Sequence, residues 1–283
     1  MPATLAVAPA PETSACTTAT PSVLLRGVAR TFATAHGTRD VLRGIDVELG
    51  TGEIVAVIGP SGCGKSTLLR LIGGLDTPSD GAIRVGGTAV VDTDDRTAIA
   101  FQEPRLLPWR TLAQNVELGL PRGTKKQQGR ARVRELLELV GLSHAADQRP
   151  REVSGGMAQR ASLARALARG PEVLLLDEPF GALDALTRLR MQDLLLEIHA
   201  AEPTTIVLVT HDVEEALYLA DRVLLLRALD ADTDAAAGSI ARAITVPGQR
   251  PRDRAARVLT DLRAELLEGL GVDTHHTLLK ENP

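Results

Sequence analysis

Cysteine is scarce in this chain, since only Cys16 and Cys63 occur among its 283 residues. Cys16 falls in an N-terminal tail, and Cys63 falls within a glycine-rich segment much further along the chain. We therefore expect no structural disulfide, which is typical of a protein that works in a reducing compartment.

Long apolar runs are also missing. No segment approaches the roughly eighteen consecutive apolar residues that a membrane-spanning helix needs. The N-terminus has neither a basic start nor a long apolar core, so it does not predict a signal peptide. We expect a soluble, cytoplasmic protein, which a partner would hold in place if it works at a membrane.

The chain has no excess of positive charge, because its formal net charge is −4 and its isoelectric point is near 5.9. Nucleic-acid-binding domains usually carry a basic patch, so we expect no nucleic-acid partner. What is present is an ordinary globular composition, with 44% hydrophobic and 24% charged residues. The length suits one large domain, with or without a subdomain.

The most informative segment is 59–67 (GPSGCGKST), called the P-loop below. It follows an apolar run, 54–58, that predicts a buried parallel strand, and it precedes a run of helical composition. Glycines let the backbone turn so that successive N–H groups point at one anion, and the helix N-terminus adds its dipole. We expect Lys65 to reach the phosphates of a nucleoside triphosphate and Ser66 to hold Mg²⁺. The predicted nucleotide-binding residues here are Gly59, Pro60, Ser61, Gly62, Cys63, Gly64, Lys65, Ser66 and Thr67.

The rest of the chain has an ordered arrangement. Residues 1–21 are rich in Ala, Pro and Thr, which predicts a disordered tail. Strand-like segments then alternate with helix-like ones, which predicts a mainly parallel sheet with a helical insertion over about 103–168. The expected strands are 23–30, 41–49, 54–58, 82–85, 98–101, 173–177, 205–210 and 222–226.

Two amphipathic helices are predicted. Over 130–142, four apolar residues follow the i, i+3, i+4, i+7 spacing, and Gly141 is the expected C-terminal cap. Over 252–270, leucines and valines again mark one face. We interpret this second face as packing on its own domain rather than on a partner, within a helical C-terminal extension over 246–283.

A pair of acidic residues, Asp177 and Glu178, ends the apolar strand over 173–176. An Asp at the end of the strand beside the P-loop holds Mg²⁺ through water in nucleotide-hydrolysing sites. The adjacent Glu178 is placed to polarise an attacking water as a general base. By itself such a pair also occurs in solvated turns, so its meaning depends on the surrounding motifs.

Those motifs follow in a set order: an SGG segment at 154–156 that opens a helix, QRASLARAL, LLLDEP, GALD and a strand that ends in TH. In this order they resemble the nucleotide-binding subunit of ATP-binding-cassette transporters, over roughly residues 22–227. The resemblance implies an α/β P-loop NTPase fold, with a mainly parallel RecA-like core sheet, an antiparallel β subdomain and an inserted α-helical subdomain. It also implies one ATP-binding domain over residues 22–245.

The resemblance assigns roles at the nucleotide. Phe32 matches the aromatic residue that stacks on adenine, and Gln102 matches the glutamine that ligates Mg²⁺ and senses the γ-phosphate. His211 matches the switch histidine, which contacts the γ-phosphate and orients either the water or Glu178. The expected catalytic residues are thus Glu178, His211, Lys65 and Gln102, and the expected Mg²⁺ ligands are Ser66, Gln102 and Asp177.

Two of these positions have ordinary alternatives. Phe32 also suits a core residue on an edge strand. His211 also suits a polar residue between a strand and the next helix, where Asp212 and Glu215 fit a capping pair. We favour the nucleotide roles because the other motifs are present in order.

Further positions imply a second copy of the chain. Ser154, Gly155 and Gly156 match the signature segment, a second glycine-assisted helix N-terminus that binds the ATP held by the opposite subunit. Asp184 matches the loop that crosses the same interface. Two ATP molecules would then lie in a head-to-tail dimer. Met157 departs from the family pattern, in which Gln is usual, and we expect this to affect the rate of hydrolysis rather than ATP binding.

The segment 101–110 (FQEPRLLPWR) lies where such subunits contact a permease, and it offers Leu106, Leu107 and Trp109 for a groove. With 181–198 and 210–226, it resembles the importer branch for nitrate, sulfonates and taurine, and within it the aliphatic-sulfonate ATPases. That implies separate membrane permease subunits, a periplasmic or lipid-anchored substrate-binding protein, and a peripheral location at the cytoplasmic face of the inner membrane. Nitrate or taurine import is the alternative, and a soluble non-transport cassette ATPase is a more distant one.

Overall fold

The computed structural model describes residues 22–35, 37–93, 95–229 and 236–272. The expected disordered tail over 1–21 lies outside the described residues, as does the end of the C-terminal extension beyond residue 272.

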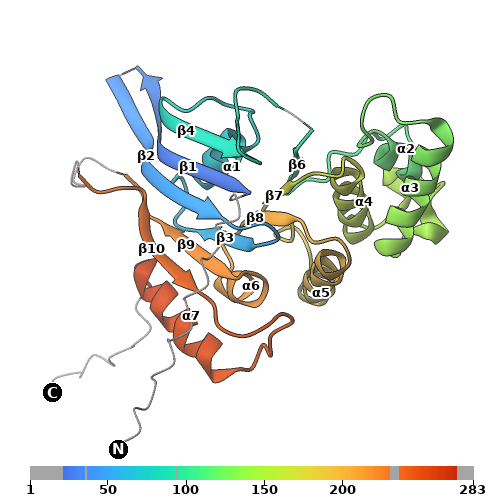
Figure 1. Ribbon diagram of the computed structural model, residues 1–283. Helices are drawn as coiled ribbons and strands as arrows, with labels where there is room; N and C mark the ends of the chain where they lie inside the picture. Colours follow the sequence, from blue (N-terminus) through green and yellow to red (C-terminus); the bar gives the residue numbers. More distant parts are fainter. Residues whose placement is uncertain (1–21, 36, 94, 230–235, 273–283) are drawn as a thin grey trace, which may run out of the picture.

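Two sheets form the frame of the molecule (Figure 1). One is antiparallel, in the order β2-β1-β4-β5, with β1 (Val23–Thr34), β2 (Gly37–Leu49), β4 (Asp80–Val85) and β5 (Thr88–Ala89). The other has the order β10-β9-β3-β8-β7-β6, with β3 (Ile54–Ile58), β6 (Thr97–Ala100), β7 (Val173–Asp177), β8 (Thr205–Val209), β9 (Arg222–Leu226) and β10 (Ile240–Thr245). Its strands pair in parallel, except that β10 is antiparallel to β9. The predicted α/β class, with a mainly parallel core and an antiparallel subdomain, is confirmed.

The order of the core sheet corrects one prediction. The strand that ends in Asp177 does not lie beside the P-loop strand, because β8 pairs with both β3 and β7. Helix α1 (Lys65–Ile72) leaves the P-loop and contacts both β8 and β7 across the sheet face. The helix that follows β3 therefore spans the intervening strand and brings its first turn to the end of β7.

Strand β3 is buried on both faces, and its side chains alternate between two cores. Ile54, Ala56 and Ile58 pack in a cluster with residues of α2–α7, whereas Val55 and Val57 pack with α1 and the antiparallel sheet. All five are buried. A strand buried on both faces reads as a continuous apolar run, which is why the sequence shows no alternation there.

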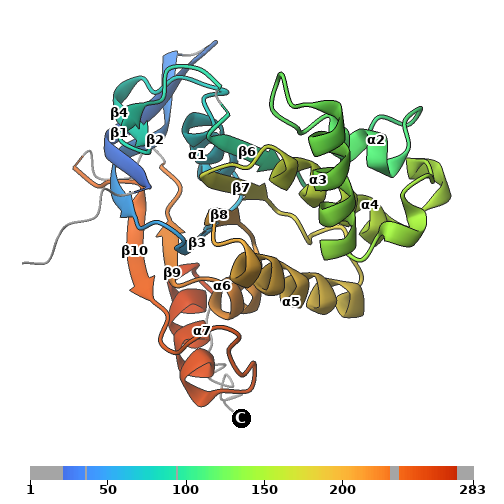
Figure 2. The same ribbon diagram turned by 45° about the vertical axis from the view of Figure 1, so that its right-hand side comes forward.

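The helices occupy three places around the sheets (Figures 1 and 2). They are α1, α2 (Leu112–Glu117), α3 (Lys126–Leu139), α4 (Gly155–Ala168), α5 (Ala185–Ala201), α6 (Val213–Leu219) and α7 (Arg257–Gly269), with short 3₁₀ turns at Ser143–Ala145 and Pro150–Glu152. Helix α1 lies between the two sheets, α5 and α6 cover the other face of the core sheet with α7 packed on α6, and α2–α4 form a helical subdomain beyond β6. The predicted cap of α3 is confirmed: Gly141 has φ +66°, and the N–H of Leu142 donates to the carbonyl of Leu137 at 2.7 Å.

Helix α7 begins at Arg257, five residues later than predicted. Arg252 lies before the helix, and its buried guanidinium donates to the carbonyls of Pro247 and Tyr218 at 3.0 and 3.2 Å. Leu259 and Leu266 of α7 are buried in the main core, so this face packs on its own domain, as expected. Within the described ranges, no helix combines the length and the apolar character needed to cross a membrane.

Candidate functional site

The P-loop joins β3 to α1 in a conformation that requires glycine. Gly62 and Gly64 have φ values of +78° and +101°, where a Cβ is strained. A Cβ on Gly64 would also lie 2.6 Å from a methyl carbon of Leu42, and one on Gly59 would lie 2.6 Å from the carbonyl oxygen of Leu226. No described side chain caps the start of α1. Its first N–H groups therefore remain available to an anion.

Lys65 and Cys63 of the P-loop have different environments. The Nζ of Lys65 donates to the carbonyls of Gly59 and Pro60 at 2.9 and 3.0 Å, which holds the ammonium against the loop. Cys63 is buried, and burial raises the pKa of its thiol. Cys63 therefore contributes packing rather than a reactive thiolate. Of the remaining predicted residues, Pro60, Ser61 and Ser66 are exposed, and Thr67 is half-buried in the first turn of α1.

Two oxygen-bearing side chains meet beside the loop. The hydroxyl of Ser66 donates to Oδ1 of Asp177 at 3.1 Å. Burial raises the pKa of Asp177, the hydrogen bond from Ser66 opposes this, and the negative charge of Glu178 adds to it. A hydroxyl and a carboxylate are hard oxygen donors of the kind that Mg²⁺ takes from proteins, alongside water and substrate phosphates. No cluster of three His, Cys, Asp or Glu suited to a metal occurs within the described part of the chain, and such a Mg²⁺ site needs none.

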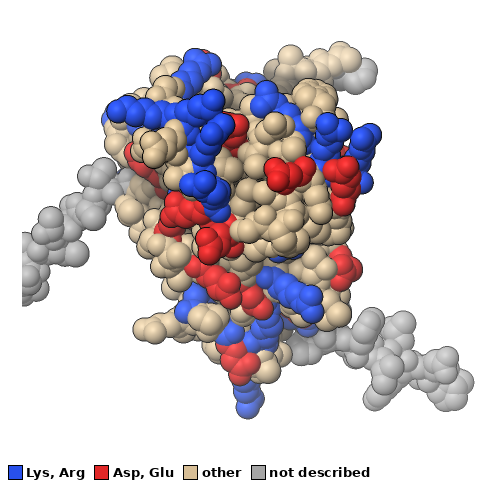
Figure 3. Space-filling view, turned by 90° about the vertical axis from the view of Figure 1, so that its right-hand side faces the viewer, with Lys and Arg blue, Asp and Glu red and all other residues tan. Residues whose placement is uncertain are grey.

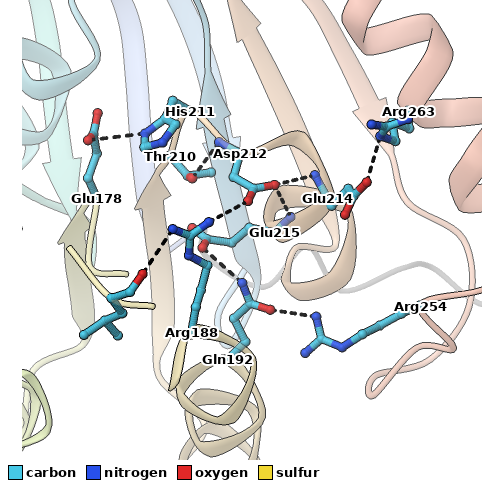
Figure 4. Close-up of polar contacts among 11 residues, drawn as sticks. Glu178, Arg188, Gln192, Thr210, His211, Asp212, Glu214, Glu215, Arg254 and Arg263 are labelled. Atoms are coloured by element: carbon cyan, nitrogen blue, oxygen red, sulfur yellow. Dashed lines mark hydrogen bonds and ion pairs between the residues drawn. The ribbon is translucent and has the colours of Figure 1, made fainter. Parts of the chain in front are cut away.

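Glu178 and His211 come together at the ends of β7 and β8. Oε2 of Glu178 lies 3.4 Å from Nδ1 of His211. Glu178 has φ +47°, which is unusual for a residue with a side chain, and its N–H donates to the carbonyl of Val209 at 2.9 Å. Such backbone strain persists only where the surrounding structure enforces it, and it is concentrated at functional sites. The strained turn directs the carboxylate towards the exposed His211 side chain (Figure 4).

Gln102 and Asp184 border the same region. Gln102 follows β6 by two residues, and its amide nitrogen lies 3.1 Å from the point where a Cβ on Gly181 would stand. Oε2 of Glu178 lies 3.7 Å from that same point, so the two side chains flank Gly181. Asp184 caps α5 by accepting from the N–H of Thr187 at 3.1 Å, and this hydrogen bonding lowers its pKa.

Other predicted residues lie elsewhere. Ser154 caps α4, accepting from the N–H of Met157 at 3.3 Å, and α4 lies apart from α1 in both views of the ribbon (Figures 1 and 2). Phe32 lies on β1 in the antiparallel sheet, with the Arg30 guanidinium 4.4 Å from its ring centre. Phe32 is 36% exposed, so the alternative of a core residue is wrong. At this position β1 pairs only with β2, because its pairing with β4 ends at Ala29.

The expected capping pair after His211 is half correct. Asp212 caps α6, accepting from the N–H groups of Glu214 and Glu215 at 2.9 and 3.1 Å. Glu215 does not reach back, because the N–H of Asp212 donates to Oγ1 of Thr210 at 3.0 Å instead. The side chain of Glu215 turns inward, where only 3% of the residue is exposed.

A buried polar network behind His211 was not predicted (Figure 4). Nε2 of Gln192 on α5 donates to Glu215 at 3.1 Å. Burial raises the pKa of Glu215 to about 7, against hydrogen bonds from Thr210 and Gln192 that lower it. Arg188, one turn before Gln192, lies 3.4 Å from Asp212 and donates to the carbonyl of Leu183 at 3.3 Å. The four-residue spacing of Arg188 and Gln192 is the only sequence signal that places them on one helix face.

Comparisons with known proteins agree with this geometry. Residues 42–181 match the family model described as ABC transporter. The aliphatic sulfonates import ATP-binding protein SsuB 2 of Burkholderia lata is 46% identical over 256 residues, which cover 90% of this chain and 88% of that protein. SsuB of Granulibacter bethesdensis is 48% identical over 255 residues, which cover 90% of this chain and 97% of that protein.

A solved structure gives the same result. The dimeric post-hydrolysis structure of the ATP-binding cassette MJ0796, bound to ADP and Pi, matches with a TM-score of 0.68 and 31% identity, covering 80% of this chain and 100% of that one. The fold and the P-loop place the chain in the class of P-loop nucleotide-binding proteins. Within this class, the chain belongs to the ABC transporter family, as an ATP-binding subunit.

Proposed function

We propose that this chain hydrolyses ATP to ADP and phosphate at the P-loop. The observation that carries the proposal is the meeting of Glu178 with His211, 3.4 Å apart, beside the Ser66–Asp177 pair. Lys65 would exchange its loop carbonyls for the β- and γ-phosphates. Glu178 would polarise the attacking water as general base, and His211 would orient Glu178 and contact the γ-phosphate. Catalysis would consist of positioning and charge stabilisation.

The same site suits Mg²⁺. Ser66 and Asp177 would hold the ion, and Gln102 would complete the set of protein ligands from the end of β6. The ion would supply neutralisation of the charge that develops on the transferred phosphoryl group. Phe32 would stack on adenine, because its half-exposed ring offers a π-face and a hydrogen-bonding group is not required.

We further propose a head-to-tail dimer of two such chains. Ser154, Gly155 and Gly156 start a second helix N-terminus in the helical subdomain, apart from the P-loop helix of the same chain. This N-terminus would bind the phosphates of ATP held by the partner, while Asp184 would lie at the interface. The MJ0796 cassette is dimeric in its post-hydrolysis structure, which supports the proposal.

The proposed partner in the membrane is a separate permease. A groove of about 360 Å³ lies between the end of β6 and the helices α2 and α4, lined by Phe101, Leu118 and Arg165 among others. Leu106 packs instead against the main core, and Trp109 is 67% exposed. A groove at this position, lined by both apolar and polar residues, would accept a short permease helix. It would hold the chain at the cytoplasmic face of the inner membrane.

The charge distribution on this side of the molecule suits a protein partner. In Figure 3, basic and acidic side chains both occur on the face shown, with a broad uncharged area between them. A continuous basic surface, which nucleic-acid binding would require, does not cover this face.

The proposed cargo is aliphatic sulfonates. The support is that the SsuB proteins named above, at 46% and 48% identity, are described as aliphatic sulfonates import proteins. A periplasmic or lipid-anchored binding protein would deliver the substrate. Import of nitrate or taurine by the same machinery is the alternative.

Replacement of Glu178 by Gln tests hydrolysis. We expect ATP to bind with unchanged affinity, while steady-state turnover falls by at least about 100-fold, because general-base catalysis contributes about that factor. The ATP-bound dimer should also persist longer, as measured by size-exclusion chromatography. Turnover at the wild-type rate would remove Glu178 from the role of general base.

Growth of a deletion strain on alkanesulfonates, taurine or nitrate as sole sulfur or nitrogen source tests the cargo. We expect loss of growth on alkanesulfonates alone, restored by the wild-type chain but not by Glu178→Gln. A defect confined to nitrate or taurine would reassign the cargo and leave the ATPase proposal in place. Normal growth on all of them would contradict the proposed cargo.

A further inference from the structure

Arg254, in the segment before α7, connects to the switch region through buried side chains (Figure 4). Its Nη1 donates to Oε1 of Gln192 at 2.7 Å, and Gln192 donates in turn to Glu215 at 3.1 Å. The backbone N–H of Glu215 donates to Oδ1 of Asp212 at 3.1 Å, and the N–H of Asp212 donates to Oγ1 of Thr210 at 3.0 Å. The residue between Thr210 and Asp212 is His211. A continuous chain of hydrogen bonds therefore runs from the C-terminal segment to the turn that carries the switch histidine.

Arg254, at the outer end of this hydrogen-bond network, has several further contacts. Arg254 donates to Asp193 at 2.9 Å through its other terminal nitrogen, and its guanidinium lies 3.4 Å from the centre of the Tyr218 ring. The Tyr218 hydroxyl donates to the same Asp193 oxygen at 2.6 Å. Arg254 thus contacts both α5 and α6. These contacts restrict the guanidinium and favour its hydrogen bond to the side-chain amide of Gln192.

At the inner end of the network, the buried polar groups have few alternative hydrogen-bond partners. Gln192 and Glu215 are 2% and 3% exposed, so a donor or acceptor that loses its partner there has little access to water. Removal of one hydrogen bond therefore weakens the next one in the network. The last residues affected are those of the turn at 210–212. Buried networks of this kind act as a unit.

We propose that Arg254, Gln192 and Glu215 are positioning residues, through which the C-terminal segment holds His211 in register with Glu178. This inference rests on the proposed hydrolysis of ATP. It states that the rate of hydrolysis depends on a segment outside the nucleotide site. The charged groups that face Glu215 are Asp212 at the start of its own helix and Arg188 from α5, with Arg254 behind Gln192.

The chain offers a matched control. Arg263, also in the C-terminal segment, pairs with Glu214 at 2.9 Å, so the neighbouring residue of α6 receives a contact of the same kind. Glu214 does not continue into the buried network, since its side chain is 71% exposed. Arg263→Met therefore removes a guanidinium contact of α7 with α6, whereas Arg254 donates to Gln192 of α5, and this substitution leaves the route to His211 intact.

The experiment measures steady-state ATP turnover of the full chain for Arg254→Met, Gln192→Leu, their combination and Arg263→Met. We expect kcat to fall about fivefold for Arg254→Met and about tenfold for Gln192→Leu, with KM for ATP within twofold of the wild type. The double variant should have the same kcat as Gln192→Leu alone, because both substitutions interrupt the same series of hydrogen bonds. Arg254→Lys, which keeps a donor, should recover part of the rate, and Arg263→Met should match the wild type.

A pH profile supplies a second readout that loss of packing would not move. The ionised Glu215 accepts the hydrogen bond from Gln192 best, so kcat of the wild type should fall as this carboxylate takes up a proton near pH 7. Glu215→Gln should lack that step and remain about threefold to fivefold below the wild type at pH 8. Melting curves show whether each variant is folded.

The outcomes separate the two proposals. Equal rates for Arg254→Met and Arg263→Met, additive losses in the double variant, or an unchanged pH step in Glu215→Gln would overturn the inference and leave ATP hydrolysis in place. A wild-type chain that does not turn over ATP would overturn both.

Discussion

The N-termini of α1 and α4 both follow glycine-containing segments, but neighbouring atoms constrain them to different degrees. At α1, Gly62 and Gly64 adopt positive φ values, and a Cβ on Gly64 would collide with Leu42. At α4, Gly155 and Gly156 lie outside the positive-φ region; a Cβ on Gly155 would meet no described atom within 4 Å, whereas one on Gly156 would lie 2.8 Å from a methyl carbon of Thr187. The first site is held by a glycine-only backbone conformation and by tertiary contacts, whereas the second is a locally capped helix whose first residue is open.

This difference matches the two proposed tasks. A site that binds phosphate within one chain has to be preorganised, because no partner subunit helps to form it when the nucleotide binds. A site that completes the partner's nucleotide needs an open approach instead. Ser154 already satisfies the N–H of Met157, so α4 is stable without a ligand, whereas α1 has no cap from a side chain that the structure describes.

Replacing each glycine by alanine is the strongest test of this comparison. Gly64→Ala should lower the free energy of unfolding by roughly 2–4 kcal/mol, because it adds both backbone strain and a collision. Gly155→Ala should change it by less than about 1 kcal/mol, and in the stabilising direction. Urea denaturation measures both, and a comparable loss at the two positions would contradict the comparison.

The second test separates phosphate binding within one chain from binding across the dimer. Lys65→Ala should weaken ATP binding to the monomer by roughly 100-fold, because charged hydrogen bonds to phosphate are lost. Ser154→Ala should leave the monomer Kd within about twofold of the wild type, yet it should reduce ATP-dependent dimerisation. Calorimetry at low protein concentration gives the monomer value, and a weakened Kd for Ser154→Ala would place the signature segment at its own nucleotide.

A smaller effect concerns the cap of α4. Ser154→Ala should lower the free energy of unfolding by about 1 kcal/mol, because the N–H of Met157 loses its acceptor. Ser154→Asp should retain most of that stability, since a carboxylate caps equally well. Thermal unfolding of the two variants is the measurement, and equal losses would mean that Ser154 does not act as a cap.

The smallest expected effect is at Met157. Its side chain is half-buried against the core, and only its backbone N–H binds Ser154. Met157→Gln should therefore change stability by less than about 0.5 kcal/mol. It should raise turnover about twofold by adding a hydrogen-bonding group at the proposed interface, and a tenfold rise would show that Met157 limits the rate.

The local parts of the site could be predicted from residue types, whereas the long-range pairs Glu178–His211 and Ser66–Asp177 were expected only through the family resemblance. The strand, glycine loop and helix around Lys65 are contiguous, so their phosphate-binding form follows from residue types alone. The strand order could not be predicted, because nothing in the sequence shows β8 between β3 and β7.

The network behind His211 was missed for a related reason. Glu215 has the composition and position of an ordinary helix-capping residue, and only its contact with Gln192, 23 residues away, shows that it is buried. The positive φ of Glu178 was likewise invisible, because favoured backbone angles for Glu give no warning of it.

The two cores on either side of β3 have a consequence for the P-loop. A shift of one residue in this strand would exchange the side chains of its two faces, putting Val55 and Val57 where Ile54, Ala56 and Ile58 now pack. Each core therefore rejects a slip that would move Gly59 by about 3.3 Å along the strand. The phosphate-binding loop thus begins at a fixed point in space, and an inserted or deleted residue within β3 should be far more damaging than any single substitution there.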